Sequence, residues 1–528
     1  MIRSIISSSF AFRAFVSSFA TISRRALLPP TVHRVLPNQY CKQRHLPPQL
    51  QPFFTTSMSA TQQISETYEN LRKAVKSRKT HSVKWRESQL RAMSEMLEVH
   101  HDDFIDALTT DLGRSEFVSE LSELAQLKAY VNDTIDILAD YVKPQGHVSM
   151  PIKFFPATGH VVPEPLGLVL IISPWNYPIL LALHPVVGAI AAGNAVLLKP
   201  SEISCASSNL MAKLIPQFLD QEAIRVVEGG VKETTEILNH KFDHIFYTGS
   251  TTVGKIVYQA AAKHLTPVTL ELGGKSPVIV DSTSNLRLSA RRVLFGKFVN
   301  CGQICVAPDY CIVAKDAASE FYEALKETYA EMFPDPLQTN SDYCRIISDA
   351  QTNRLVSFLR ETDSAELSKR GQLLLGGEFD TDSKFIGITA FQNTSLDAKI
   401  MQDEIFGPLL PIVEVETIDE AIDIVNDRPK PLALYVFTSD QSLIEKVTQQ
   451  TSSGAISINE CLMHFTVEDL PFGGVGDSGM GCYHGKASFA TFSHMKTLFH
   501  QSGRSVMDPP FRYPPYSDKK RWLMRKFF

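Results

Sequence analysis

Cys305 is the residue whose surroundings best suit a nucleophile. It lies in the segment GKFVNCGQICVAPDY (296–310), after a Gly-Gln turn and before Val-Ala-Pro. A thiol exposed on such a loop can attack an electrophilic carbon once it has lost its proton, because the thiolate is the reactive species. Most isolated cysteines are small buried hydrophobic residues, so a catalytic role requires partner residues.

Two other segments carry such partners. Glu271, in LELGGKSP (270–277), stands where an apolar strand meets a Gly-Gly turn. A carboxylate at a strand's carboxyl end lies where open α/β sheets bind ligands, and burial there raises its pKa and suits a general base. Asn176, in SPWNYP (173–178), can donate its side-chain amide to a developing oxyanion. The plainer alternatives are a solvated turn carboxylate and an asparagine that stabilises its own turn.

Three segments favour nucleotide binding. In YTGSTTVGK (247–255), Gly249 and Gly254 flank the end of a strand and a helix predicted from Val253. Helix N-terminal amides favour a phosphate group, although this pattern is weak by itself. In LKPSE (198–202), Lys199 and Glu202 can form hydrogen bonds to ribose hydroxyls. The alternative is an ordinary strand end without a binding role.

The third segment is QDEIFGPLLP (402–411), which places Glu404 and Phe406 on a turn before a strand. A loop without a binding role is the alternative interpretation of this segment.

The elements that must position these residues alternate between strands and helices. Residues 62–143 have helical spacing, and 147–165 alternate around Pro and Gly as a β-hairpin does. From 167 to 270, apolar strands alternate with helices, which predicts βαβ units and a parallel sheet. A second α/β region begins near Gly273. The charge-free stretch 166–198 contains three prolines and two asparagines after Ser173, so we interpret it as buried soluble structure rather than a membrane span.

Charge and cysteine content exclude some classes of function. The chain has 528 residues and a net charge of −5, and its first 65 residues hold seven Lys or Arg and no acid. Removing those seven positive charges leaves −12, which is unsuited to binding a nucleic acid backbone. The eight cysteines form no CxxC pair, which favours a reducing compartment and argues against a zinc site.

The N-terminal segment resembles an organelle transit peptide, because it is basic, rich in serine and free of acids. We expect residues 1–57 to be disordered or cleaved, and we favour the mitochondrion because the arginines begin at position 3. A plastid is the alternative, and a product starting at Met58 would be cytosolic.

Taken together and in this order, these motifs resemble those of the aldehyde dehydrogenase superfamily, over residues 62–515. FYTGS, LELGGKSP, GQICVAP and EIFGPLLP form a specific set. The segment PFGGVGDSGMGCYHGKASFATFSH (471–494) is similar to the class 3 branch, which includes fatty aldehyde dehydrogenases.

The resemblance implies roles for the residues named above. Cys305 would attack the aldehyde carbon, Asn176 and the Cys305 backbone N–H would hold the oxyanion, and Glu271 would activate the water that hydrolyses a thioester. NAD is the implied cofactor, with NADP possible, and the Glu202 carboxylate should disfavour a 2′-phosphate. The implied cofactor-binding residues are Trp175, Lys199, Glu202, Gly249, Ser250, Gly254, Leu272, Glu404 and Phe406.

The fold implied is α/β, with a doubly wound cofactor domain, an α/β catalytic domain and a small β-bridge for oligomerisation. We expect the N-terminal helices and cofactor domain at 58–270, with the bridging hairpin near 147–165. The catalytic domain would follow at 271–470, and 471–528 would supply bridging strands and a substrate-entrance tail. Class 3 enzymes are typically dimers, so a homodimer is expected.

The substrate implied is a medium- or long-chain aliphatic aldehyde, with aromatic aldehydes next. Rival chemistries are CoA-acylating or phosphorylating dehydrogenases, and Glu271 in LELGG favours water as acceptor. A non-catalytic binding protein is a further alternative, which Cys305, Glu271 and Asn176 together disfavour. The basic and aromatic tail 517–528 suggests peripheral membrane contact, against a solvated terminus or a lid.

Overall fold

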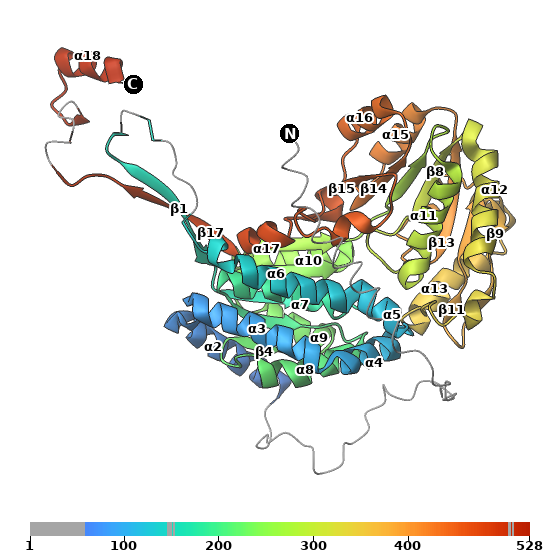
Figure 1. The fold of residues 1–528 in the computed structure, drawn as a ribbon, viewed down its shortest axis with the longest axis horizontal. Helices are drawn as coiled ribbons and strands as arrows, with labels where there is room; N and C mark the ends of the chain where they lie inside the picture. Colours follow the sequence, from blue (N-terminus) through green and yellow to red (C-terminus); the bar gives the residue numbers. More distant parts are fainter. Residues whose placement is uncertain (1–58, 145–149, 152–153, 505–507, 509–511, 528) are drawn as a thin grey trace, which may run out of the picture. The chain divides into compact units, whose positions relative to one another are not determined.

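The computed structural model describes residues 59–144, 150–151, 154–504, 508 and 512–527 (Figure 1). The predicted targeting segment therefore lies outside the described residues. Within the described part, helices and strands alternate from residue 168 onward, and they build two larger sheets and two short two-stranded sheets.

Amphipathic helices precede the first sheet. The first of them, α2, begins with a capping box in which Gln62 N donates to Ser59 Oγ at 3.3 Å and Ser59 N donates to Gln62 Oε1 at 2.9 Å. Together the helices of this region confirm the helical prediction for 62–143. The helices are α2 (Ala60–Ser77), α3 (Val83–Val99), α4 (His101–Leu112), α5 (Glu116–Ser119) and α6 (Ala125–Tyr141).

The first large sheet has six strands in the order β16-β6-β5-β2-β3-β4. From β2 the chain adds β3 and β4 on one side, and it then returns to add β5 and β6 on the other, which is doubly wound topology. The strands are β2 (Leu168–Ile172), β3 (Ala195–Lys199), β4 (Ile224–Val226), β5 (His244–Gly249), β6 (Val268–Leu272) and β16 (Gly479–Met480). The connecting helices are α7 (Leu180–Ala192), α8 (Cys205–Phe218), α9 (Val231–Leu238) and α10 (Thr251–Ala262).

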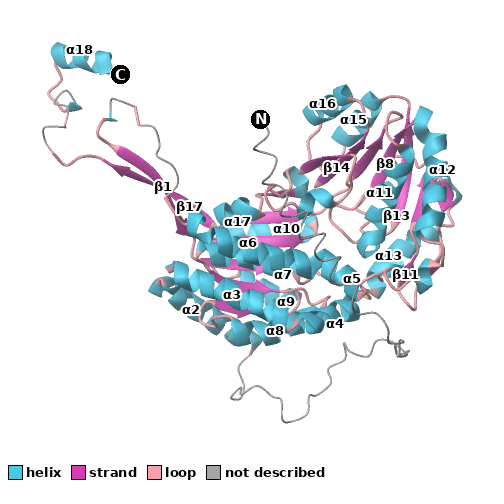
Figure 2. Ribbon diagram, in the orientation of Figure 1, coloured by secondary structure: helices cyan, strands magenta, loops and turns pink. Residues whose placement is uncertain are grey.

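Burial explains the apolar runs of this region. Every residue of β2 and β3 is buried, and Figure 2 shows the strands of this sheet between helices. The stretch 166–198 therefore forms strand, loop, helix and strand, as expected. Among the residues that the structure describes, no helix has the length and apolar character needed to span a bilayer.

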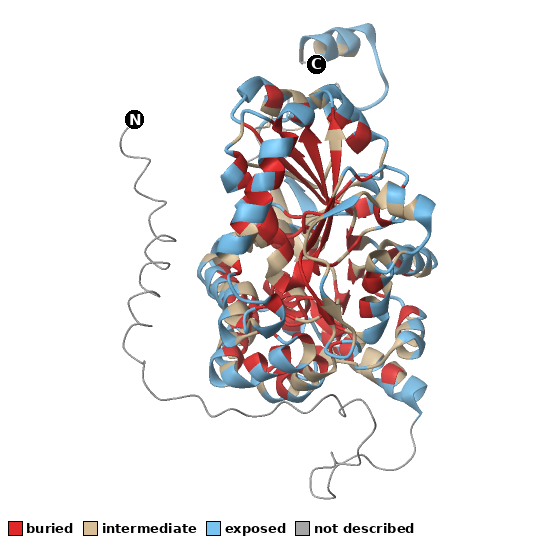
Figure 3. Cartoon of the chain, turned by 90° about the vertical axis from the view of Figure 1, so that its right-hand side faces the viewer, coloured by how far each residue is buried: buried red, intermediate tan, exposed pale blue. Residues whose placement is uncertain are grey.

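The second large sheet has seven strands in the order β15-β14-β7-β8-β13-β12-β9, all parallel except the β12–β9 pair. Figure 3 shows its strands as buried and the outer sides of its helices as exposed. The strands are β7 (Pro277–Val280), β8 (Tyr310–Ala314), β9 (Gln372–Leu375), β12 (Thr389–Gln392), β13 (Leu409–Val415), β14 (Ala433–Phe437) and β15 (Ala455–Ile458). The helices are α11 (Leu286–Phe298), α12 (Lys315–Met332), α13 (Asp349–Leu359), α14 (Ser364–Arg370), α15 (Ile418–Asn426) and α16 (Gln441–Gln450), and β10 (Phe379–Asp380) pairs with β11 (Phe385–Ile386).

The bridging element contains a strand from the C-terminal segment, as expected of 471–528, while most of the first half of the predicted hairpin near 147–165 lies outside the described residues. The strand β1 (Thr158–Pro165) pairs antiparallel with β17 (Ser493–His500), far along the chain, rather than with a neighbouring strand. Residues 154–157 form turns, with Ala157 N donating to Phe154 O at 2.7 Å. Pro151 and Pro156 lack the N–H that a strand ladder requires there, and 145–149 and 152–153 lie outside the described residues.

The C-terminal segment also returns to the first sheet. Strand β16 pairs antiparallel with β6, so that Gly479 lies opposite Glu271. The helix α17 (Gly485–Thr491) leads into β17, and α18 (Asp518–Phe527) ends the described chain. The motif around Tyr483 and His484 is thereby brought next to the strand that carries Glu271.

Candidate active site

Parallel pairing brings the predicted residues to one edge of the six-stranded sheet. Asn176 follows β2, Lys199 ends β3, Gly249 ends β5, and Glu271 lies one residue before the end of β6. The carboxyl ends of parallel strands share an edge, and ligands bind there where the strand order reverses, which here is between β2 and β5.

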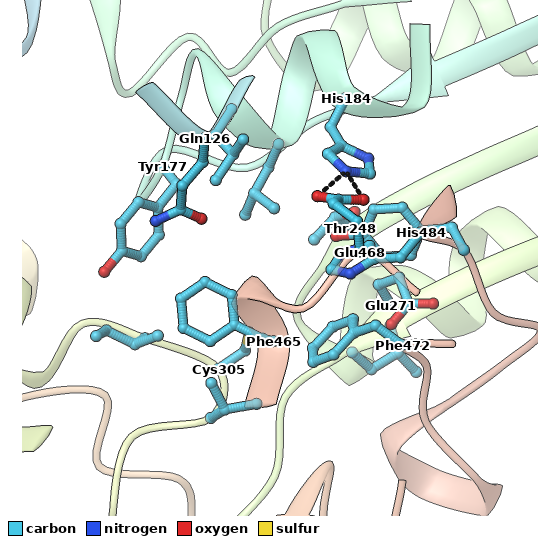
Figure 4. A pocket seen from close by; sticks show the side chains of 16 residues that line it. Gln126, Tyr177, His184, Thr248, Glu271, Cys305, Phe465, Glu468, Phe472 and His484 are labelled. Carbon is cyan, nitrogen blue, oxygen red and sulfur yellow. Dashed lines mark hydrogen bonds and ion pairs between the residues drawn. The ribbon is translucent and has the colours of Figure 1, made fainter. Parts of the chain in front are cut away.

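A pocket opens beside this edge (Figure 4). It contains both Cys305 and Glu271, the two residues predicted to do covalent and acid–base chemistry. Its wall is mostly apolar and aromatic. The lining residues are Gln126, Tyr177, Leu180, Leu181, His184, Thr248, Glu271, Leu272, Ile304, Cys305, Val306, Phe465, Glu468, Phe472, Tyr483 and His484.

The thiol of Cys305 is half-buried rather than exposed as expected. It faces a pocket with aromatic walls, where Phe465 and Phe472 lie beside it in Figure 4. Burial, followed by the nearby carboxyl groups of Glu404 and Glu271, raises the pKa of the thiol to about 12. Cys305 therefore carries its proton at neutral pH in this state, and attack on a carbonyl requires that a base accept the proton.

Glu271 is buried, with 3% of its surface exposed. Neither carboxylate oxygen has a hydrogen-bond partner among the described residues. Burial alone raises the pKa of this carboxyl well above 4.5. Burying a carboxyl group without hydrogen-bond partners destabilises the folded state. Such a group is suited to exchange a proton with water or with a bound molecule.

Asn176 lies outside the pocket lining but is joined to the Cys305 loop. Its Nδ2 donates to the backbone carbonyl of Gln303 at 3.0 Å. The Nδ2 of Asn300 donates to the same carbonyl at 3.1 Å and to the carbonyl of Asn176 at 3.0 Å. These bonds fix the turn after β2 against the turn before the thiol.

A buried ion pair that no sequence motif indicated supports this junction. Arg114 and Glu123, both 0% exposed at the side chain, form a salt bridge. Arg114 also donates to the carbonyl of Asn176 and, through Nε, to Asn300 Oδ1 at 3.0 Å. Glu123 Oε2 accepts from the N–H groups of Ile179 and Leu180 at 2.9 and 2.8 Å. The pair thus anchors both ends of the Asn176 turn.

The strand-to-helix turn after β5 has the features expected of a phosphate site. The helix α10 begins at Thr251, two residues before the predicted start. Ser250 caps it, because the Ser250 hydroxyl accepts from Val253 N at 3.4 Å. A side chain at Gly249 would collide with the Tyr247 hydroxyl. A Cβ at Gly254 would lie 2.7 Å from Leu272 Cδ2, so this glycine lets α10 pack against the end of β6.

Lys199 and Glu202 form a pair at the end of β3. Lys199 Nζ lies 2.6 Å from Glu202 Oε2, and the lysine side chain is 5% exposed while the glutamate is 44% exposed. The buried cation therefore holds an accessible carboxylate at the end of β3, which can accept hydrogen bonds from a ligand.

The Glu404 loop closes over the opposite side of the edge. A side chain at Gly273 would collide with the Glu404 carboxylate, and burial raises the pKa of that carboxyl to about 8. Phe406 packs edge-to-face on Trp175, with 5.2 Å between ring centroids. Asp309, which the motifs did not indicate, fixes this loop by accepting from Ile405 N at 2.9 Å and Lys275 Nζ at 2.6 Å.

The structure therefore divides the predicted residues into two groups. Cys305, Glu271 and Leu272 share the pocket, and the remaining nine lie on the surrounding strand ends and loops rather than in its lining. Most of the wall was not predicted, because Phe465 lies outside the quoted motifs and no role was assigned to Tyr177 or Phe472 within theirs. His484, in the 471–494 segment, also lines the pocket, together with Tyr483.

Comparison with known proteins agrees with this arrangement. The family model described as the aldehyde dehydrogenase family matches residues 41–498. "Aldehyde dehydrogenase family 3 comG" of Dictyostelium discoideum is 44% identical over 464 residues, 88% of this chain and 97% of that protein. The rat "aldehyde dehydrogenase, dimeric NADP-preferring" is 44% identical over 452 residues, 86% and 98% of the two chains.

A solved structure shows the same fold. The substrate-bound state of Staphylococcus aureus AldH superimposes with a TM-score of 0.84 at 39% identity, covering 88% of this chain and 99% of that one. The chain therefore belongs to the aldehyde dehydrogenase family, with relatives in family 3, and is an aldehyde-oxidising enzyme.

Proposed function

We propose that this enzyme oxidises an aldehyde to the carboxylic acid through a thioester on Cys305, with NAD or NADP as electron acceptor. The observation that carries the proposal is that Cys305 and a buried, unpartnered Glu271 line one pocket. A nucleophile and a general base in one mostly apolar pocket supply the two steps that acyl transfer to water requires.

The first step is attack of the Cys305 sulfur on the aldehyde carbon. The C–S bond forms as the carbonyl π electrons move to oxygen, and the thiol proton passes to a base. Asn176 is assigned to hold the resulting oxyanion, together with the Cys305 backbone N–H. Its side-chain amide donates to the Gln303 carbonyl, and its backbone carbonyl accepts from Asn300 and Arg114. This fixed position supports the role, because a preorganised donor stabilises charge without reorganising.

The residues around the pocket fit a dinucleotide. Ser250 and the first turn of α10 would hold the pyrophosphate, and Lys199 with Glu202 the adenosine ribose. Glu404 would hold the nicotinamide ribose, with Trp175, Phe406 and Leu272 beside the ring. When bound, the nicotinamide accepts the hydride that leaves the carbon attached to Cys305.

Glu271 then completes the reaction by activating water. Its raised pKa makes the ionised carboxylate a stronger base than an ordinary glutamate, and no protein donor competes for its oxygens among the described residues. Water attacks the thioester carbon and gives its proton to Glu271, the C–S bond breaks, and the acid leaves. Retention of this carboxylate favours water over CoA or phosphate as the acceptor.

The substrate we propose is a medium- or long-chain aliphatic aldehyde, with aromatic aldehydes as the second class. The apolar wall, which includes Leu180, Leu181, Ile304, Phe465 and Phe472, supports this class because it can remove a hydrocarbon chain from water.

The deciding experiment follows NADH formation by the chain starting at Met58, with aldehydes from acetaldehyde to hexadecanal and benzaldehyde. Wild type should give NADH and acid without CoA, and Cys305→Ser should give neither. Glu271→Gln should release one equivalent of NADH per site and then stall, because the thioester forms but is not hydrolysed. If no aldehyde gives NADH from NAD or NADPH from NADP, a binding function replaces the catalytic one.

We further propose a homodimer built on the β1–β17 ribbon. The rat relative is named dimeric, and Leu498 and Phe499 on β17 are each 51% exposed, which is apolar surface that a second strand can cover. The molar mass in solution tests this, and Leu498→Lys with Phe499→Lys should give monomers.

For residues 1–57 we propose mitochondrial import, supported by seven basic residues without an acid. Fusion of this segment to a fluorescent reporter tests it. Chloroplast signal would favour a plastid, and diffuse signal would contradict a targeting role.

A further inference from the structure

The pocket contains a second polar group besides the predicted catalytic residues. His184, on α7, directs Nε2 at both carboxylate oxygens of Glu468, at 3.1 and 3.2 Å. In Figure 4 this pair lies on the side of the pocket away from Cys305. Both residues line the pocket, so a bound aldehyde whose carbonyl reaches Cys305 can extend its chain toward them.

Aromatic neighbours fix the His184 ring. Tyr130 stacks on it with 3.8 Å between centroids and an interplanar angle of 2°, and Tyr483 meets it edge-on at 5.1 Å. The residue is only 3% exposed, and its Nδ1 has no hydrogen-bond partner among the described residues. The Nε2–H therefore donates to Glu468 and fixes the orientation of its carboxylate.

Glu468 is held from two sides but stays reachable. It lies in the turn between η7 (Met463–Thr466) and β16, and its side chain is 27% exposed. A Cβ at Gly485, where φ is +45°, would approach the Glu468 carbonyl to 2.5 Å, so the turn rests directly on the helix start after His484. The contact with Nε2 leaves lone pairs on the Glu468 carboxylate that a ligand can use.

We propose that Glu468, positioned by His184, determines substrate specificity by accepting a hydrogen bond from a hydroxyl group on the aldehyde's chain and by repelling aldehydes that carry a carboxylate. This inference rests on the proposed aldehyde oxidation, and it narrows the substrate within that class. A hydroxyl suits the site better than an ammonium group, because the surrounding wall is largely apolar and desolvating a full charge costs more than desolvating a hydroxyl.

The test compares three aldehydes of equal chain length that end in methyl, hydroxyl or carboxylate, in a series from butanal to nonanal. For the best-fitting length, Glu468→Leu should lower the hydroxyl-to-methyl ratio of kcat/KM by about tenfold, the value of a hydrogen bond to a charged group. It should raise the carboxylate-to-methyl ratio by a similar factor, about tenfold. The methyl-terminated substrate serves as internal reference for folding.

Asp469→Asn is the matched control, because this adjacent carboxylate is exposed and does not line the pocket. It should leave both ratios unchanged. His184→Leu should move the ratios in the direction of Glu468→Leu, mainly through KM, because it releases the carboxylate without touching the reacting atoms.

Failure of the proposed aldehyde oxidation and failure of the proposed role of Glu468 give different results. Absence of activity toward every aldehyde in wild type overturns the proposed function. The role of Glu468 is overturned if the enzyme oxidises the methyl-terminated series but Glu468→Leu leaves both kcat/KM ratios unchanged. It is also overturned if Asp469→Asn shifts the two ratios as much as Glu468→Leu does, because the effect then comes from general surface charge.

Discussion

The side-chain amide of Asn176 donates to the backbone carbonyl of Gln303 at 3.0 Å, two residues before Cys305. An amide nitrogen carries two N–H bonds, and this contact uses one of them. The contact therefore orients a donor at the loop that carries the nucleophile, although Asn176 and Cys305 are more than a hundred residues apart in sequence.

Replacing Asn176 by alanine should lower kcat by about 10²- to 10³-fold, the usual loss when one oxyanion donor is removed. Dinucleotide binding, measured by fluorescence titration, should be retained, because the amide is assigned to the reacting oxygen. An unchanged kcat in a folded variant would mean that Asn176 serves only its own turn.

The buried Arg114–Glu123 pair should govern the stability of the same junction. Arg114→Met leaves Glu123 charged in a site with no exposure, so we expect the free energy of unfolding to fall by about 3–5 kcal/mol. Denaturant unfolding measures this. Arg91→Met, which removes an exposed ion pair with Glu87, is the control and should cost at most about 1 kcal/mol. Equal effects in the two variants would argue against a structural role for the buried pair.

Glu271 should make the protein less stable as pH rises. Its folded pKa is raised well above 4.5, so the folded state binds the proton more tightly than the unfolded state. Below pH 4.5 both states are protonated and the residue has no effect. Above it, the unfolded state ionises first and gains free energy, about 1.4 kcal/mol per unit of pKa difference, until the folded carboxyl also ionises.

Glu271→Gln should therefore stabilise the protein at neutral pH, and the gain should disappear toward pH 4. Thermal unfolding of both proteins across this range measures the difference. A gain that is independent of pH would show that the effect comes from packing instead of ionisation.

The sequence predicted the strands and the residues at their ends well, for a physical reason. Buried parallel strands such as β2 and β3 are continuous apolar runs, and the polar residues that follow them, such as Lys199, must lie at the sheet edge. Local spacing therefore placed Glu271 and Asn176 correctly at strand ends of this sheet, while their catalytic roles stay predictions.

Long-range partners could not be predicted in this way. β1 pairs with β17 and β16 with β6 across more than two hundred residues, and strand pairing at that separation leaves no local pattern. Likewise, Arg114 and Glu123 lie in ordinary helical sequence, and only the fold brings them to Asn176. The exposure of Cys305 was overestimated because the aromatic wall comes from distant segments such as 465–483.

Cofactor preference should depend on Glu202. Its carboxylate, held at 2.6 Å by Lys199, would repel the 2′-phosphate of NADP, so Glu202→Gln should shift the kcat/KM ratio toward NADP by about tenfold. Glu222→Gln, an exposed acid distant in sequence from the strand end, serves as control. An unchanged ratio would mean that residues other than Glu202 discriminate between NAD and NADP. The rat relative is named NADP-preferring, so use of NADP is the outcome to compare against.

The helix α18 should attach the enzyme to anionic lipid surfaces. It carries Lys519, Lys520, Arg521, Arg525 and Lys526 together with Trp522 and Met524, which are 55% and 46% exposed. Basic residues are attracted to anionic headgroups, and an exposed indole is suited to the interface. This contact would hold the enzyme where long-chain aldehydes are dissolved.

Flotation with vesicles of phosphatidylserine and phosphatidylcholine tests this prediction. The full chain should float and a chain ending at Ser517 should not, while both stay unbound to pure phosphatidylcholine. Because the attraction is electrostatic, added salt should release the full chain. A Trp522→Ala variant should float less at equal charge, since the apolar contribution is lost. Equal flotation of the full and shortened chains would instead identify α18 as a solvated terminus.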